Sequence, residues 1–170
     1  SLKSAFDAAR KFAENPRGWL VLSGGYGTGK THLAAAIGNY RQSSGDNPMF
    51  VVVPDLLDHL RATFSPNSQV SMDSMFDRVK NTYLLILDDL GTQSATPWAR
   101  EKMYQLFNHR YAAELPTVIT TSLPLKELDP RISSRMGDTR LCQVIEINAE
   151  PFTGQALPRA TRTRPKLSST

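Results

Sequence analysis

The chain is poor in the residues that build disulfide frameworks and metal clusters. Cys142 is its only cysteine, which excludes an internal disulfide and favours a small buried side chain. The three histidines, His32, His59 and His109, are too scattered along the chain to form a set of metal ligands. No charged and apolar leader opens the chain at Ser1. We therefore expect a cytoplasmic protein.

Long hydrophobic runs are also missing. The apolar stretches at 19–22 and 84–87 are far shorter than the roughly 18 residues that suggest a membrane-spanning helix. They have the length of buried strands instead. The sequence therefore predicts no membrane segment and no membrane partner.

Positive charge is concentrated at the end of the chain. The net charge is +4, and the segment 151–170 contains Arg159, Arg162, Arg164 and Lys166 but no acidic residue. This segment is rich in Thr, Ser and Pro, which favours a solvated, flexible tail over a binding surface. We predict one folded domain over 1–148 and a flexible basic tail over 149–170. Because the chain begins with serine, we also expect it to be a fragment of a longer protein.

Short apolar and β-branched runs alternate with segments of helical periodicity. The runs lie at 19–23, 49–53, 84–88, 117–121 and 143–147, and the helical segments at 2–14, 30–42, 55–64, 70–80 and 97–114. This alternation predicts a parallel sheet with helices on both faces. Thr96 and Pro97 suit the N-cap and first position of the last helix, and Trp98, Tyr104 and Phe107 have the spacing of core residues on it.

A glycine-rich segment joins the first apolar run to a helical segment. Its sequence is Gly24-Gly25-Tyr26-Gly27-Thr28-Gly29-Lys30-Thr31, followed by His32, and its spacing matches the phosphate-binding pattern G-x-x-x-x-G-K-[ST]. The glycines let backbone N–H groups surround the phosphates, and Lys30 brings a positive charge to them. The Thr31 hydroxyl suits a Mg²⁺ ligand. The segment predicts a nucleoside-triphosphate site that uses Mg²⁺.

Two adjacent carboxylates end the third apolar run. Neighbouring side chains on a strand point to opposite sides, so Asp88 and Asp89 are expected to have different roles. In P-loop enzymes a carboxylate at this place holds Mg²⁺, which we assign to Asp88. Asp89 is then the candidate that orients the attacking water. Together with the glycine-rich segment, this pair predicts hydrolysis as well as binding.

Two further stretches resemble one protein family. They are LLILDDLGTQSATPWAREKMYQLFNHRY at 84–111 and LPTVITTSLPLKELDPRISSRM at 115–136. They are similar to the ATPase domain of bacterial replicative helicase loaders of the DnaC/DnaI type and of the related transposase helper IstB. The resemblance covers about residues 17–147. It implies an α/β P-loop NTPase of the AAA+ type, with a five-stranded parallel sheet of order 5-1-4-3-2 and no helical lid domain.

The resemblance also implies roles for residues outside the glycine-rich segment and the acidic pair. Ser122 stands where the family commonly has an asparagine that senses the γ phosphate, and its shorter side chain makes strong hydrolysis less certain. Arg135 matches the arginine that the family presents to the nucleotide of a neighbouring subunit, and Arg131 is the second candidate. Arg140 is a weak candidate for a further sensor. These assignments imply self-association, with Arg135 contributed in trans.

The leading functional hypothesis is an ATPase that loads the replicative DNA helicase and assembles on single-stranded DNA. Two helical segments between the second and third runs carry Arg61, Arg78 and Lys80, with Phe64 available for stacking, although amphipathic crossover helices more often face the core. One alternative is a transposition helper of the IstB type, which engages duplex DNA. Another is a nucleotide-dependent binding module with little hydrolysis.

Overall fold

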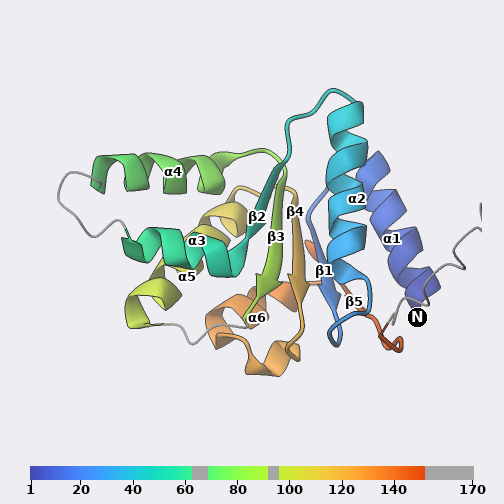
Figure 1. Cartoon of the computed structure of the whole chain (residues 1–170). Helices are drawn as coiled ribbons and strands as arrows, with labels where there is room; N and C mark the ends of the chain where they lie inside the picture. The colour runs from blue at the N-terminus through green and yellow to red at the C-terminus, as the bar shows by residue number, and fades with distance from the viewer. Residues whose placement is uncertain (63–68, 92–95, 152–170) are drawn as a thin grey trace, which may run out of the picture.

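A five-stranded parallel sheet forms the centre of the molecule (Figure 1). The computed structural model describes residues 1–62, 69–91 and 96–151. The strands are β1 (Trp19–Ser23), β2 (Met49–Val52), β3 (Leu85–Leu90), β4 (Thr117–Thr121) and β5 (Cys142–Glu146). Their order is β2-β3-β4-β1-β5, and every neighbouring pair is parallel. This confirms the predicted order, here counted from the opposite edge.

Helices cover both faces of the sheet, as the alternating pattern predicts (Figure 1). The helices are α1 (Leu2–Glu14), α2 (Lys30–Ser43), α3 (Val53–Ala62), α4 (Gln69–Asn81), α5 (Pro97–Ala112) and α6 (Pro130–Met136), with a short 3-10 helix η1 (Leu125–Glu127). Helices α1 and α2 pack on the face that contains Leu20, Leu22 and Ile86. Helices α3, α4, α5 and α6 pack on the other face. Burial of both strand faces explains why the apolar runs are nearly continuous.

Two strands end elsewhere than the sequence predicts, and one helix was not predicted, each for an identifiable reason. Strand β3 runs two residues beyond Asp88, because the Thr121 hydroxyl donates to the Leu90 carbonyl after a shift of register in the β3–β4 pairing. Strand β2 ends early because helix α3 begins at Val53. Helix α6 was not among the predicted helical segments, since its 7 residues are too few to show a clear period. Its N-cap is Asp129, whose carboxylate accepts from the N–H of Arg131.

The predicted start of α5 is confirmed. Thr96 is the N-cap, its hydroxyl accepts from the N–H of Ala99, and Pro97 is the first helical residue. Phe107 is fully buried on this helix, and Cys142 is buried at the start of β5, as expected. Phe64 and the segment 152–170 lie outside the described residues. Within the described ranges, no helix has both the length and the apolar character that a membrane span requires.

One buried arginine ties several elements together at the amino ends of the strands. Arg110 of α5 is 1% exposed, and burial lowers its pKa to about 10, so it remains charged at neutral pH. Its guanidinium donates five hydrogen bonds, to the main-chain carbonyls of Lys80, Thr82, Tyr83 and Pro116 and to the hydroxyl of Thr117. These acceptors lie at the end of α4 and at the approaches to β3 and β4. Arg110 therefore fixes where two central strands begin.

Candidate nucleotide-binding site

The glycine-rich segment forms a loop between β1 and α2, at the carboxyl end of β1. Gly24 has φ +149°, and a Cβ atom there would collide with the carbonyl oxygen of Ile147, so this position needs glycine. Gly29 is the left-handed N-cap of α2, with φ +91° and no side-chain cap. Because glycine has no side chain, the N-cap accepts no side-chain hydrogen bond from the first N–H groups of α2. Such a helix N-terminus suits an anion.

Lys30 is folded back under this loop. Its side chain is buried, and Nζ donates to the carbonyl oxygens of Gly24 and Gly25, each at 2.6 Å, and contacts Thr28 Oγ1 at 3.4 Å. Burial lowers the pKa of Lys30, while the carboxylates of Asp89 and Asp88 oppose the shift. The loop thus holds a cation at its centre. Among the described residues, its hydrogen-bond acceptors are all uncharged oxygens.

The two carboxylates of β3 differ in burial and in backbone conformation. Asp88 is buried, and its carboxylate accepts from the Thr31 hydroxyl at 2.9 Å and from the Thr120 hydroxyl at 2.6 Å. Asp89 is partly exposed and has a left-handed backbone, with φ +65°. Its N–H donates to the same Thr120 hydroxyl at 2.9 Å. Asp88 is therefore bonded to the helix that carries Lys30, while Asp89 is more exposed and lines the same cleft.

Thr120 is the residue of this site that sequence reasoning missed. Its one hydroxyl donates to the Asp88 carboxylate and accepts from the Asp89 main chain, so it fixes both acidic residues from β4. The sequence shows only Thr120 and Thr121 at a strand end, which is an ordinary pattern. The pairing of β4 beside β3 was the signal that could have found Thr120, because it brings the ends of these two strands together.

A cleft of about 1070 Å³ lies over the loop and the strand ends. Its lining includes most of the predicted site, namely Tyr26, Gly27, Thr28, Gly29, Lys30, Thr31, His32, Asp88, Asp89 and Ser122. Thr120 lines it as well, and Leu2 of α1, Val52 of β2 and residues 149–151 after β5 form the remaining walls. The predicted boundary at 148 therefore cuts through this cleft. Nucleotide phosphates and an adjacent base both fit a cleft of this size.

The oxygen donors in the cleft suit a magnesium ion. Asp88 and Thr31 already lie within hydrogen-bond distance of each other, so one ion could be shared by the carboxylate and the hydroxyl. Within the described ranges, no group of three or more His, Cys, Asp or Glu side chains is placed to hold a metal. That fits Mg²⁺, which in such sites takes one or two protein ligands together with substrate phosphates.

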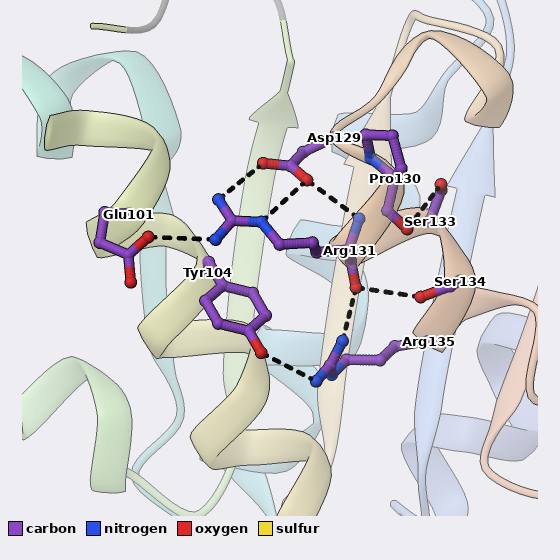
Figure 2. Close-up of polar contacts among 8 residues, drawn as sticks. All are labelled: Glu101, Tyr104, Asp129, Pro130, Arg131, Ser133, Ser134 and Arg135. Atoms are coloured by element: carbon purple, nitrogen blue, oxygen red, sulfur yellow. Dashed lines mark hydrogen bonds and ion pairs between the residues drawn. The ribbon is translucent and has the colours of Figure 1, made fainter. Parts of the chain in front are cut away.

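The two candidate arginines are not in this cleft. Arg131 and Arg135 lie on α6 and contact α5, as Figure 2 shows, and neither is among the described residues that line the cleft. Arg131 pairs with Asp129 and Glu101, each at 3.1 Å, and its hydrogen bonds lower the pKa of the Asp129 carboxyl. Arg140, the weak sensor candidate, pairs with Asp138 just before β5, at the amino ends of the strands. It is thus far from the loop.

A family model described as IstB-like ATP binding protein matches residues 8–150. The chain belongs to this family. The match includes the whole sheet, the glycine-rich loop and the acidic pair, so the resemblance seen in the two central stretches extends over nearly the whole described chain.

Curated relatives of this IstB-like chain are helicase loaders. The replicative helicase loader DnaC of Escherichia coli (strain K12) is 29% identical over 138 residues, which cover 79% of this chain and 56% of the loader. The replicative helicase loader DnaI of Bacillus subtilis (strain 168) is 31% identical over 124 residues, covering 72% of this chain and 39% of DnaI. The chain thus spans about half the length of DnaC, and less of DnaI.

Solved structures share the fold. A crystal structure of the DnaC helicase loader matches with a TM-score of 0.70 and 25% identity, covering 85% of this chain and 89% of that one. A crystal structure of DnaI matches with a TM-score of 0.72 and 26% identity, covering 88% of this chain and 82% of that one. The replication initiator DnaA bound to AMPPCP and single-stranded DNA gives 0.75 at 22% identity over 87% of this chain, which shows a common fold. The IstB-like chain therefore has the AAA+ P-loop architecture, and its described residues include no lid domain.

Proposed function

We propose that this chain binds and hydrolyses ATP with Mg²⁺ and uses that cycle to load a replicative DNA helicase. The observation that carries the proposal is the hydrogen bond that links the glycine-rich loop and α2 to the acidic end of β3. Lys30 is held inside the loop, while the next residue, Thr31, is bonded to Asp88 of β3. The helicase-loader relatives supply the process in which such an ATPase acts.

The cleft residues divide the chemical work. Backbone N–H groups from Gly27 to Thr31 and the Lys30 ammonium bind the phosphates and offset their negative charge. Mg²⁺, held by Thr31 and Asp88, would supply further charge neutralisation at the phosphates when bound. Asp89 lines the cleft and is partly exposed, with its main chain fixed by Thr120, which suits a carboxylate that orients the attacking water. Thr120 acts as the positioning residue for both carboxylates.

Ser122 follows β4 and lines the same cleft, so its hydroxyl is available to hydrogen-bond to a phosphate oxygen or to the water. We propose it as the sensor, with a shorter reach than an asparagine. A short sensor is consistent with weak hydrolysis that assembly or DNA stimulates.

The remaining catalytic group is proposed to come from a second copy of the chain. Arg135 is outside its own cleft, so it serves a nucleotide only when it reaches a neighbour's cleft. Its guanidinium would stabilise the charge that spreads over the transferred phosphoryl group. Arg131 stays the second candidate, although two carboxylates already neutralise it. Nucleotide binding and self-association are then coupled.

The proposed partners are the replicative helicase and single-stranded DNA, in the cytoplasm. The charged residues first considered for DNA are in part paired within their own helices, with Arg61 near Asp58 at 3.5 Å and Lys80 near Asp77 at 3.7 Å. Exposed pairs of this kind are weak and can exchange for phosphate contacts. The proposal of DNA binding therefore rests on the loader relatives rather than on a preformed basic patch.

Phosphate release from ATP, measured with and without DNA, tests this function. We expect single-stranded DNA to raise the rate several-fold above that of the free chain, and duplex DNA to have a smaller effect. Stimulation by duplex DNA alone would favour the transposition helper instead. Release no faster than that of Lys30→Ala under every condition would leave only the nucleotide-dependent binding module.

A further inference from the structure

A cluster of polar and aromatic side chains joins α5 to α6 outside the cleft. Arg135 donates from Nη1 to the main-chain carbonyl of Arg131 at 2.7 Å, and from Nη2 to Asn108 Oδ1 at 2.6 Å and to the Tyr104 hydroxyl at 3.3 Å. Figure 2 shows Tyr104 between the side chains of Arg131 and Arg135. The guanidinium carbons lie 4.3 Å and 5.1 Å from the centre of its ring.

The two arginines of this cluster differ in how their charge is balanced. Arg131 forms ion pairs with Asp129 and Glu101. Arg135 forms no ion pair with any residue in the described ranges, and its hydrogen-bond acceptors are a carbonyl, a hydroxyl and an amide. These acceptors fix the direction of the guanidinium without cancelling its charge. Arg135 is thus an oriented cation whose charge no carboxylate of the described chain offsets.

The aromatic contacts restrict Arg135 further. Its guanidinium lies 5.5 Å from the centre of the Tyr111 ring as well as beside Tyr104. Its Nε–H is buried and has no acceptor among the described residues. The three hydrogen bonds to Arg131, Tyr104 and Asn108 also leave one N–H of Nη1 unused, so only part of the donor capacity is used. A side chain that is rigid, charged and incompletely bonded is suited to an anion brought from outside.

We propose that Asn108 and Tyr104 are positioning residues for Arg135, and that they hold it as an uncompensated cation for the nucleotide phosphates of a second copy of this chain. This inference rests on the proposed function, because it names how that function's trans-acting arginine is presented. The amide of Asn108 is central to it. A carboxylate at the same place would accept the same hydrogen bond but would compete with a phosphate for the charge.

Asn108→Asp tests this directly, because it changes the charge next to Arg135 with almost no change of shape. We expect kcat for phosphate release by the assembled chain to fall roughly tenfold, part of the effect of losing a trans-acting arginine. KM for ATP should stay near the parent value, since the loop of the same chain binds the ground state. The thermal midpoint of unfolding should not fall, since the hydrogen bond is kept.

The matched control is Gln105→Glu, which adds the same charge to an exposed position of the same helix. It should leave kcat at the parent value. Tyr104→Leu should also lower kcat at unchanged KM, because it removes the ring that both guanidinium groups contact. Thermal unfolding of that variant checks that α5 and α6 remain packed.

Arg135→Ala distinguishes the trans-acting role of Arg135 from the positioning role of Asn108. If Arg135→Ala lowers kcat but Asn108→Asp behaves like Gln105→Glu, the positioning role is wrong while the trans-acting arginine stands. If Asn108→Asp raises kcat, the contact restrains Arg135 rather than presenting it, and the inference is again overturned. If Arg135→Ala itself releases phosphate at the parent rate, the proposed function of Arg135 fails, whatever Asn108 does.

Discussion

Replacing Lys30 with alanine should reduce phosphate release from ATP by roughly 10²–10³-fold, the range seen when one preorganised charge-stabilising donor is removed. The reason is the position of its ammonium group. It is buried beneath the loop and bonded to the Gly24 and Gly25 carbonyls, so no other described cation can take its place at the phosphates. Affinity for ATP, measured by titration with a fluorescent analogue, should fall as well.

The fold should survive this change. Gly24 and Gly25, whose carbonyls lose a donor, are not buried, so water can replace the lost hydrogen bonds. The thermal midpoint of Lys30→Ala should stay near that of the parent. Lys11→Ala, at an exposed position of α1, is the matched control and should change neither activity nor stability. Parental phosphate release by a folded Lys30→Ala variant would contradict the assignment of the loop.

Replacing Arg110 with methionine should have the largest effect on stability. Methionine keeps much of the side-chain length but donates no hydrogen bond. Four carbonyls and the Thr117 hydroxyl then lose the Arg110 donor, and of these the Pro116 carbonyl keeps the N–H of Leu85. Buried polar groups left unpaired in this way should lower the free energy of unfolding by on the order of 3–5 kcal/mol. Chemical denaturation monitored by tryptophan fluorescence measures this, because Trp19 is buried at the start of β1.

Arg100→Met on the same helix is the control for Arg110. Arg100 is exposed, so its replacement should change the free energy of unfolding by less than about 0.5 kcal/mol. If both variants unfold at the same denaturant concentration as the parent, the hydrogen bonds of Arg110 do not stabilise the starts of β3 and β4.

The parts predicted from sequence are those that local patterns determine. Strand β1, strand β4 and helix α1 have the predicted bounds, because apolar runs and helical periods are properties of neighbouring residues. The glycine-rich loop was found for a similar reason, since its spacing and its flanking strand and helix are contiguous. Strand alternation predicted different roles for Asp88 and Asp89, but the left-handed backbone of Asp89 and the register shift between Leu87 and Leu90 are not visible in the sequence.

The parts that were missed depend on residues far apart in the chain. Thr120 matters because β4 lies beside β3, and Arg110 matters because its acceptors come from α4 and from the approaches to two strands. An arginine on a helix usually faces solvent, so the pattern around Arg110 gave no reason to expect burial. The difference between Arg131 and Arg135 likewise depends on Glu101 and Asn108 of α5, which no local pattern connects to α6.

The central claim is that two copies of the chain complete one ATP site. Mixing Arg135→Ala chains with Asp89→Asn chains tests it most directly, because each lacks a different half of the site. Each variant alone should release phosphate near background. In an equal mixture, random pairing makes about one quarter of the interfaces complete, so the rate should rise toward about a quarter of the parent rate. A mixture that is no more active than the average of its two components would contradict a shared site.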